Sequence, residues 1–344
     1  MTVSARSVSV VVPAYNASQT LGRCVRSVLD TGYPDLEIII VDDRSTDDTS
    51  TVAEGLIEEF GPMVKLIRQQ QNGGPAKARN AGARLATSDL IFFLDSDTRM
   101  HADALDKFVV AMEGADAVSG TYSAAPLNRG LVPAYKALLN NYFFCRRGVI
   151  GYEVLDSSRA GMRADLFREL GGFNENLAWG MDYENEEFGY RISENHRLVL
   201  DPSIQVDHVF PGFGKLTRTY FLRVAFWMEV FVRRRRFESG GVASAETGLA
   251  SAALLAAIAL LVVAIAGWTL GLVDASWALV AILPFIVYAY GYGGFFGFVL
   301  QRRPLLLPAM AALNLYFTLV IGCGAAYGLV RAVLGKSETE VFAR

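Results

Sequence analysis

The sequence predicts an α/β fold, a Rossmann-like and mostly parallel sheet, followed by transmembrane α-helices. Up to about residue 120, short runs of β-branched and apolar residues alternate with stretches of helical periodicity. Such alternation is typical of parallel strands connected by helices that cover both faces of a sheet. Residues 249–334 carry almost no charge and raise the mean hydropathy of the chain to +0.28. An apolar excess placed in long continuous runs favours membrane helices.

The expected elements of the first half follow one another in a regular order. The strands are Val8–Val12, Glu37–Val41, Val64–Ile67, Leu90–Leu94 and Ala117–Ser119. The helices between them are Ser18–Asp30, Asp47–Phe60, Pro75–Ala86 and Asp103–Glu113. Because crossovers between parallel strands are right-handed, we expect an open sheet with its ligand site at the carboxyl ends of the strands.

The pattern is less regular from residue 120 to 210. The stretch "RADLFRELGGF" predicts a helix that ends at Gly171 or Gly172, and "YENEEFGYRISEN" predicts another helix. A final extended segment is expected in "RLVLDPSIQVDHVF". We therefore place the end of the globular domain at residue 215.

Residues 216–240 are expected to form an interfacial amphipathic helix. The stretch "TRTYFLRVAFWMEVFVRRRRF" is rich in aromatic residues, carries several cations and precedes the first long apolar run. Such a helix can lie in the plane of the membrane surface. An ordinary surface helix is the alternative interpretation.

The transmembrane region is expected at residues 249–334. Residues 249–273 and 276–300 each exceed the roughly 20 apolar residues that cross a bilayer, and 304–334 is long enough for one tilted crossing. A hairpin of the first two spans returns Arg302 and Arg303 to the side of Arg233–Arg236. A third crossing then puts Arg331 on the opposite side, against the positive-inside tendency. A re-entrant third segment is the alternative.

Several features limit the partners and the compartment. The N-terminal stretch has no cleavable signal pattern, so the globular part is expected to be cytoplasmic and the protein to be a multi-pass protein of the cell (inner) membrane. Cys24, Cys145 and Cys323 lie far apart, without metal-ligand spacing, and are expected to be reduced thiols. The net charge of −3 argues against nucleic acid as a partner. The sequence leaves open whether the chain forms a homo-oligomer.

Four motifs end strands or begin a helix at one edge of the predicted sheet. They are "VVPAYN", "IIIVDDRSTDDT", "GGPAKARNAG" and "FFLDSD". An aromatic ring, acids, cations and a helix N-terminus together suit a nucleotide diphosphate, with the ring near the base and the cations near the phosphates. The residues that we expect to bind this nucleotide diphosphate, as the donor of a transferred group, are Pro13, Ala14, Tyr15, Asp42, Asp43, Lys77, Arg79, Asp95 and Ser96.

Asp95 and Asp97 are the candidate metal ligands. Two carboxylates at one sheet edge repel one another unless a cation lies between them, and hard oxygen ligands suit Mg²⁺ or Mn²⁺. A solvated turn is the alternative interpretation of a single D-x-D motif. The order and spacing of all four motifs favour the metal.

Together these motifs resemble family 2 glycosyltransferases of the GT-A fold. The resemblance covers about residues 1–210 and depends on "VSVVVPAYNASQTL", "IIIVDDRSTDDT", "ARNAG" and "LDSD". It implies a nucleotide-sugar donor, a divalent metal and inversion at the anomeric carbon. Nucleotidyltransferases have related sheets, but their usual G-x-G-T-R loop is absent from this sequence.

The segment "RADLFRELGGFNENLAWGMDYENEEFGYRI" is similar to the acceptor side of that family. The family pattern has an E-D pair whose Asp acts as general base, six residues before an Arg. Counting back from Arg191 reaches Asn185, so this sequence has Glu184 and Asn185 at the pair. An amide cannot take a proton, which leaves Asp182 or Glu184 as the candidate base; either could instead be a helix N-terminal acid. Trp179 is a candidate acceptor contact.

The missing base suits a lipid phosphate acceptor. A sugar hydroxyl needs a base as it attacks, whereas a phosphate is already anionic near neutral pH. Arg233, Arg234, Arg235 and Arg236 are the candidate phosphate ligands, although cations beside a span also mark its cytoplasmic end. His208 is a third candidate metal ligand, or a core histidine. The family's processive members have Q-x-x-R-W, which is absent here and favours transfer of a single sugar.

The sequence therefore predicts a membrane-anchored, inverting glycosyltransferase. The expected acceptor is lipid-linked, in the most specific form a polyprenyl phosphate. Transfer to a hydroxyl of a membrane lipid or growing glycan is one alternative. A degenerate module that binds without catalysis is the other, and Asn185 is the residue that keeps it open.

Overall fold

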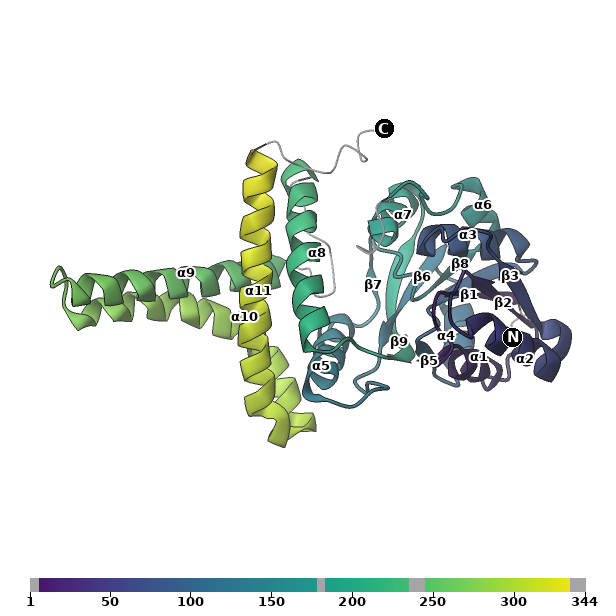
Figure 1. Cartoon of the computed structure of the whole chain (residues 1–344), viewed down its shortest axis with the longest axis horizontal. Coiled ribbons are helices and arrows are strands. Elements are labelled where there is room, and N and C mark those ends of the chain that lie inside the picture. Colours follow the sequence, from purple (N-terminus) through teal and green to yellow (C-terminus); the bar gives the residue numbers. More distant parts are fainter. Residues whose placement is uncertain (1–5, 178–182, 235–244, 335–344) are drawn as a thin grey trace. The chain divides into compact units, whose positions relative to one another are not determined.

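The computed structural model describes residues 6–177, 183–234 and 245–334 (Figure 1). The chain divides into two compact units. The first consists of residues 1–128 and 144–209, and the second of residues 129–143 and 210–344. Each unit has its own core.

The described part of the first unit contains a nine-stranded sheet in the order β3-β2-β1-β4-β8-β6-β9-β5, with β7 paired to β9. The parallel strands are β1 (Val8–Ala14), β2 (Leu36–Asp42), β3 (Val64–Arg68), β4 (Leu90–Leu94), β6 (Ala117–Tyr122) and β9 (Leu198–His208). The antiparallel strands are β5 (Thr98–Met100), β7 (Ile150–Gly151) and β8 (Arg159–Arg163). This mixed, mostly parallel sheet confirms the fold class expected from the sequence.

Helices cover the sheet where the periodicity indicates them. They are α1 (Leu21–Leu29), α2 (Thr49–Phe60), α3 (Pro75–Leu85), α4 (Ala104–Ala111), α6 (Ala164–Glu169) and α7 (Tyr183–Asn195). Every strand and helix expected in residues 8–119 is present, with ends that differ by a few residues.

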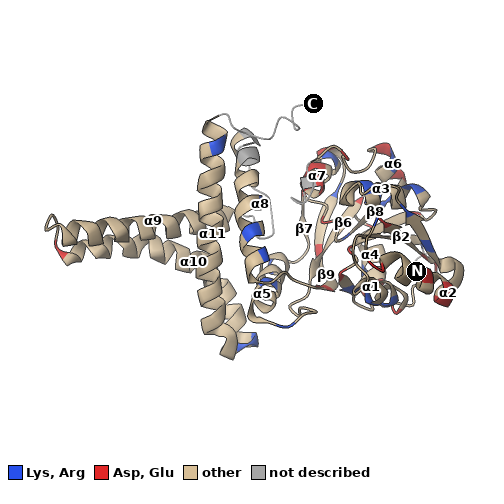
Figure 2. Cartoon of the chain, in the orientation of Figure 1, with Lys and Arg blue, Asp and Glu red and all other residues tan. Residues whose placement is uncertain are grey.

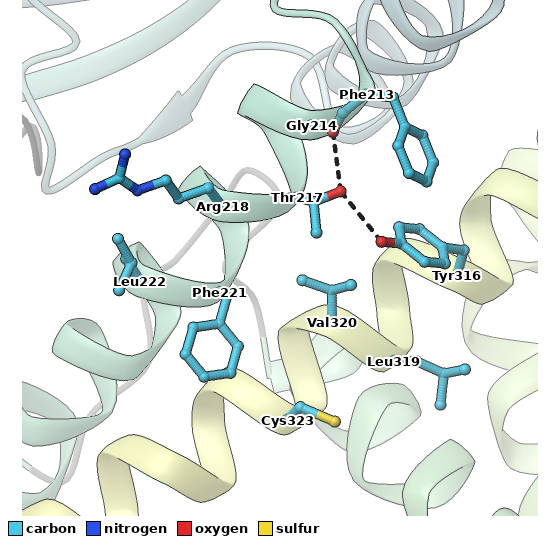
Figure 3. Close-up of a pocket in the computed structure, with 10 residues that line it drawn as sticks. All are labelled: Phe213, Gly214, Thr217, Arg218, Phe221, Leu222, Tyr316, Leu319, Val320 and Cys323. Carbon is cyan, nitrogen blue, oxygen red and sulfur yellow. Dashed lines mark hydrogen bonds between the residues drawn. The ribbon is translucent and has the colours of Figure 1, made fainter.

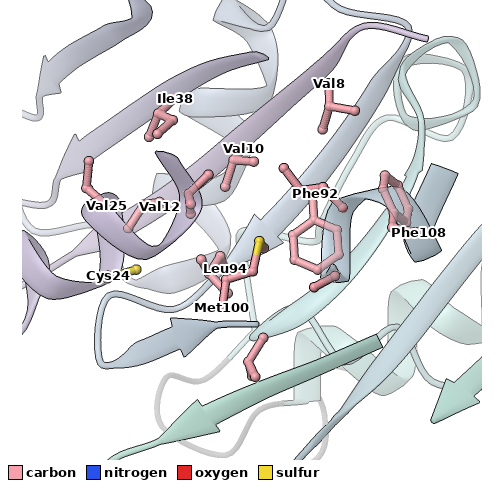
Figure 4. Close-up of a cluster of buried hydrophobic side chains, with 14 of the residues drawn as sticks. Val8, Val10, Val12, Cys24, Val25, Ile38, Phe92, Leu94, Met100 and Phe108 are labelled. Carbon is pink, nitrogen blue, oxygen red and sulfur yellow. The ribbon is translucent and has the colours of Figure 1, made fainter. Parts of the chain in front are cut away.

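Alternation along the central strands builds the core on one face of the sheet. Val8, Val10 and Val12 on β1 are fully buried beside Phe92 on β4, and the Phe108 ring of α4 meets Phe92 edge-on at 5.0 Å (Figure 4). The opposite face receives α3. A Cβ added at Gly82 would lie 2.4 Å from the Cγ1 atom of Val11, so α3 packs closely against β1. This contact holds the second half of α3 against β1.

The sequence did not indicate β8, which is inserted between β4 and β6. β8 pairs antiparallel with β4, with Leu94 opposite Arg159. Its residues thereby reach the same sheet edge as the end of β4. Helix α5 (Leu131–Cys145) was also not expected, and most of it belongs to the second unit.

The second unit is helical. After α5 it contains α8 (Phe213–Arg234), α9 (Ala245–Thr269), α10 (Ile282–Arg302) and α11 (Leu307–Val333), with short 3₁₀ segments η2 (Ala275–Ala281) and η3 (Pro304–Leu306). Three of its helical stretches, Ala245–Thr269, Ala275–Arg302 and Pro304–Val333, are long and apolar enough to cross a membrane. These match the three apolar segments expected from the sequence. Helix α8 begins four residues before the aromatic stretch at residue 217.

Candidate active site

The carboxyl ends of β1, β2 and β4 bring three of the four motifs to one edge of the sheet. Ala14 on β1 is in register with Asp42 on β2, and the N–H of Asp43 donates to the Ala14 carbonyl at 2.9 Å. Asp95 follows Leu94, the last residue of β4. The parallel register of these strands therefore produces the juxtaposition that the motif spacing predicts.

The fourth motif is attached to this edge through Asp43. The two carboxylate oxygens of Asp43 accept the N–H groups of Gly73 and Gly74, each at 2.8 Å. Gly74 has a φ of 84°, a conformation that favours glycine, and it directly precedes α3. Burial raises the pKa of Asp43, and the two glycine N–H groups oppose that rise. Asp43 thus holds the loop that positions α3, with the exposed Lys77 at its first turn.

Asp42 has a similar supporting role in the next loop. Its Oδ1 accepts the N–H of Ser45 at 2.9 Å, and its Oδ2 accepts the Ser50 hydroxyl. Asp42 and Asp43 are 3% and 4% exposed. Both carboxylates are therefore occupied within the protein, and contact with a base or ribose remains a prediction for either of them.

Tyr15 is an exposed aromatic residue at this edge of the sheet. It is 50% exposed and follows Pro13 and Ala14 at the end of β1. The next residue, Asn16, has a φ of 50° and accepts the N–H of Thr46 at 2.8 Å with its side-chain oxygen. The loop after β1 is thereby fixed to the loop after β2, which leaves the Tyr15 ring at the surface.

Arg79 connects the sheet edge to α7. One guanidinium nitrogen donates to the Oδ1 of Asp95 at 2.9 Å and another to the Oε1 of Glu184 at 3.1 Å. The side chains of Arg79 and Glu184 are 6% and 5% exposed. Removing one partner of such a buried pair leaves an uncompensated charge. Arg79 therefore positions Asp95 in this structure, and its contact with donor phosphates remains a prediction.

Asp97 is the more accessible acid of the D-x-D motif. Its side chain is 41% exposed, that of Asp95 is 32% exposed, and Ser96 between them is half-buried. The Oδ1 of Asp97 lies 3.3 Å from the Nε2 of His208, which packs at 4.7 Å against the Tyr122 ring. Desolvation raises the pKa of Asp95, Arg79 opposes that rise, and the neighbouring Asp97 adds to it.

These features fit a divalent cation. Burial is the main cause of the raised pKa of Asp95, and the nearby Asp97 carboxylate adds a like charge that a metal ion would stabilise. Within the part of the chain that the structure describes, no group of three or more His, Cys, Asp or Glu side chains is arranged to hold a metal. A cation bound by Asp95 and Asp97 would therefore need oxygen ligands from a diphosphate or from water.

Arg159, a buried cation beside Asp95, was not expected from the sequence. Arg159 on β8 is 3% exposed and lies 3.9 Å above the centre of the Tyr122 ring. It donates to the carboxylate of Asp156 and the hydroxyl of Ser158, each at 2.8 Å. The carbonyl of Ser158 accepts the Asp95 N–H at 3.3 Å. An arginine directly before the apolar run "AGM" was the only available signal.

A second cluster missed from the sequence surrounds Asp207 near the end of β9. Asp207 is 2% exposed and accepts hydrogen bonds from Arg99 at 2.9 Å, from the His101 ring at 3.0 Å and from the Ser123 hydroxyl. Burial alone would raise its pKa, but these hydrogen bonds lower the pKa of Asp207 to about 2. This cluster fixes β9, and hence His208, against β5 and β6.

On the acceptor side, Asn185 is a structural group. Its side-chain oxygen accepts the Ser157 hydroxyl at 2.5 Å, and its backbone carbonyl accepts the Leu155 N–H at 3.2 Å. A Cβ added at Gly189, one turn along α7, would lie 2.4 Å from the Glu153 carbonyl oxygen. Asn185 thus helps to fix the segment between Glu153 and Ser158 against α7.

The other predicted acceptor-side side chains are not among those that the structure describes. Trp179, Asp182, Arg235 and Arg236 lie outside the described residues. Arg233 and Arg234 end α8, and their side chains are likewise not described.

The second unit contains a groove between α8 and α11, with a volume of about 700 Å³ (Figure 3). The Thr217 hydroxyl lies 3.3 Å from that of Tyr316, and Arg218 is exposed at the rim. The lining residues are mostly apolar: Phe213, Gly214, Thr217, Arg218, Phe221, Leu222, Tyr316, Leu319, Val320 and Cys323. The volume is within the range of small-molecule sites, roughly 300–1,000 Å³.

The order of this mixed, mostly parallel sheet indicates a GT-A-type fold. A comparison with solved structures agrees. The mannosyltransferase PcManGT from Pyrobaculum calidifontis, in complex with GDP-Man and Mn²⁺, superposes with a TM-score of 0.57 and 18% sequence identity. The superposition covers 96% of this chain and 88% of that protein.

Residues 9–171 match the model of glycosyl transferase family 2. Glycosyltransferase GlyG of Streptococcus pneumoniae is 34% identical over 33% of this chain and 38% of its own length. Glycosyltransferase AglE of Haloferax volcanii is 25% identical over 69% of this chain and 79% of its own length. The matched segment thus covers less than half of the more similar of these two relatives.

Proposed function

We propose that the chain transfers a sugar from a nucleotide-sugar donor to a lipid phosphate, in the most specific form a polyprenyl phosphate, with inversion at the anomeric carbon. The observation that carries this proposal is the Asp95–Asp97 pair at the carboxyl edge of the sheet, where Arg79 holds Asp95 and Asp97 is partly exposed. The mannosyltransferase from Pyrobaculum was solved with GDP-Man and Mn²⁺, which supports a nucleotide sugar and a divalent metal here.

In this mechanism the edge of the sheet binds the donor. Tyr15 stacks on the base, Asp95 and Asp97 face the diphosphate, and Lys77 with the start of α3 adds positive potential. A divalent cation, when bound, neutralises charge on the departing nucleoside diphosphate, and Mg²⁺ or Mn²⁺ suits the carboxylate ligands. His208, 3.3 Å from Asp97, stays a predicted ligand of that cation, although in the described part of the chain it does not form a three-ligand group with Asp95 and Asp97.

The acceptor oxygen attacks the anomeric carbon on the face opposite the diphosphate. The bond from that carbon to the acceptor forms as its bond to the diphosphate oxygen breaks, and the nucleoside diphosphate leaves with both bonding electrons. A phosphate oxygen brings its own negative charge, so no proton has to be removed. A hydroxyl acceptor would need a base in the same step.

The acceptor-side contacts favour the phosphate. Asn185 accepts the Ser157 hydroxyl and cannot take a proton. The Glu184 carboxylate is buried and bonded to Arg79, so as a base it would have to leave that pair. Asp182 lies outside the described residues and is the remaining candidate base.

The second unit supports a lipid as the acceptor. It has three helical stretches apolar enough to cross a membrane, and α8 carries cations while α9 has no Lys or Arg (Figure 2). The groove between α8 and α11 offers an apolar surface for a hydrocarbon chain, with Arg218 at its rim for a phosphate. Arg233–Arg236 extend that positive charge along the sequence. We place the protein in the cell (inner) membrane with its globular domain cytoplasmic.

A transfer assay with Mn²⁺, a panel of nucleotide sugars and a polyprenyl phosphate tests this proposal. The expected result is formation of a lipid-linked sugar that requires both the metal and the phosphate. Product on a lipid hydroxyl instead would support the alternative acceptor. Absence of both transfer and donor hydrolysis, in a protein that still binds the donor, would support a module that binds without catalysis.

Glu184→Gln sharpens the choice between acceptors. If the acceptor is a phosphate, this change should lower the rate modestly, because the amide oxygen still accepts from Arg79. Loss of a general base would lower it by about 10²–10⁴-fold. The measurement is a pH–rate profile of both forms with polyprenyl phosphate. A basic limb in the unchanged protein that Glu184→Gln lacks would contradict the phosphate acceptor.

A further inference from the structure

Helices α8 and α11 run side by side in the same direction. The Phe213 ring stacks on Tyr316 with centres 4.8 Å apart. Further along, a Cβ added at Gly324 would lie 2.5 Å from the Phe221 carbonyl oxygen, and one at Gly328 would lie 2.0 Å from that of Ala225. These glycines allow direct contact between the two backbones, as in closely packed membrane helices. The pair therefore behaves as one body, and both helices must lie at a similar depth.

Helix α8 is too charged to lie in the hydrocarbon core. Its 22 residues include Lys215, Arg218, Arg223, Glu229, Arg233 and Arg234. Charged side chains are rare and costly at the bilayer centre, whereas an aromatic helix with several cations is suited to the interface. Because α11 packs along α8 from Tyr316 to Gly328, it shares that interfacial position.

The α9–α10 hairpin has the properties of a membrane crossing. Figure 1 shows α9 and α10 running across α8 and α11, extending well beyond them. Asp274 at the hairpin tip is the one charged residue between residues 249 and 300 (Figure 2). Val263, Leu272 and Leu283 are 69%, 75% and 71% exposed. At 1.5 Å per residue, the 25 residues of α9 reach about 37 Å, enough for a hydrocarbon core of about 30 Å.

We propose that the α9–α10 hairpin crosses the bilayer and that α11 does not. In this arrangement the α8–α11 pair lies along one leaflet, with the cations of α8 toward its anionic headgroups. Two crossings place the globular domain, Arg302, Arg303 and Arg331 on the same side, in agreement with the positive-inside tendency. A third crossing would put Arg331 opposite Arg302. The proposal does not depend on the reaction that the first unit catalyses.

Cysteine labelling of the full-length protein in intact cells tests this arrangement. In a background with Cys24, Cys145 and Cys323 replaced by alanine, single cysteines are introduced at exposed positions: Asp106→Cys on α4, Ser276→Cys at the hairpin tip and Leu334→Cys after α11. Each is treated with a membrane-impermeant maleimide before and after permeabilisation. We expect Ser276→Cys to be labelled before permeabilisation. Asp106→Cys and Leu334→Cys should be labelled only after permeabilisation.

The comparison between positions decides the result. Leu334→Cys on the side opposite to Asp106→Cys would establish a crossing by α11 and overturn the proposal. Ser276→Cys on the same side as Asp106→Cys would overturn it as well, because the hairpin would not cross. A fluorescent protein fused after Arg344 of the unsubstituted chain gives an independent reading. Its fluorescence supports a cytoplasmic C-terminus on the side of the globular domain, and a dark but fully translated fusion contradicts it.

Discussion

The two units of this chain place their polar and apolar groups in opposite ways. In the first unit Phe92 and Phe93 are fully buried, and Asp42 and Asp43 lie at the carboxyl end of the sheet. In the second, Leu272 and Leu283 are more than 70% exposed, while Asn314 is fully buried. Asn314 there joins two tyrosines, accepting from the Tyr288 hydroxyl at 2.8 Å and donating to Tyr135 at 3.2 Å.

This difference is the one expected if the first unit folds in water and the second in a membrane. In water the burial of apolar surface stabilises a core, and strand ends are free to carry polar chemistry. In lipid, apolar surface has little reason to be buried, and helices associate through small residues and internal hydrogen bonds. The Gly324 and Gly328 contacts and the Asn314 network are of that second kind.

Asp97→Asn should strongly lower the transfer rate of the first unit without unfolding it. The change keeps the shape of the side chain but removes one of the two carboxylates that we propose face the donor diphosphate. We expect the transfer rate to fall by about 10²–10³-fold, the loss typical of removing one group that stabilises developing charge. Asp106→Asn, on the exposed face of α4, is the matched control and should retain full activity. Equal rates for the two variants would remove Asp97 from the site.

Gly328→Ala should separate α8 from α11. The added Cβ would meet the Ala225 carbonyl oxygen at 2.0 Å, so one backbone has to move. Overpacking of this kind costs about 1–3 kcal/mol, measured as a lower thermal midpoint in detergent. Gly297→Ala on α10 is the control, because no atom lies within 4 Å of the added Cβ. If both variants unfold at the same temperature, the helix pair does not depend on this contact.

Asn314→Ala should destabilise the second unit because it removes buried hydrogen bonds between its helices. The change removes the shared partner of the Tyr135 and Tyr288 hydroxyls. Unsatisfied buried groups cost about 1–3 kcal/mol in total, which thermal unfolding in detergent would detect. Leu315→Ala, at the neighbouring and exposed position, should change the midpoint less. A larger decrease of the thermal midpoint in Leu315→Ala than in Asn314→Ala would mean that packing of the exposed apolar side chain contributes more to stability than the Asn314 hydrogen bonds.

The smallest effect is expected from Asp207 at acid pH. Its pKa is lowered to about 2, below the usual value of about 3.9, so its contribution to stability is present above about pH 4. That contribution is lost as the pH falls toward 2. In Asp207→Asn the decrease in stability between pH 5 and pH 2 should be smaller by about 1 kcal/mol. An unchanged pH dependence, measured by denaturant unfolding, would show that Asp207 is not bonded in this way.

Local pattern was sufficient to predict much of the first unit. Alternating residues in Val8–Val12 and Leu90–Leu94 indicated the strands, and the strand ends located Tyr15, Asp43 and Asp95 at one edge. The apolar lengths likewise indicated the three helical stretches of the second unit. These features depend on residues close together in the chain, because period and length are local properties.

Only the tertiary structure decided which groups meet at that edge and within the helical unit. Arg79 pairs with Glu184, 105 residues away, and Asn185 binds Ser157 where the sequence suggested only a lost base. The inserted strand β8 brings Arg159 beside Asp95, and Gly328 brings α11 against α8. A one-dimensional pattern tells which face of an element is buried but does not identify the partner on the other side. Those partners are chosen by strand order and helix packing, and here they determine that Arg79 holds a carboxylate.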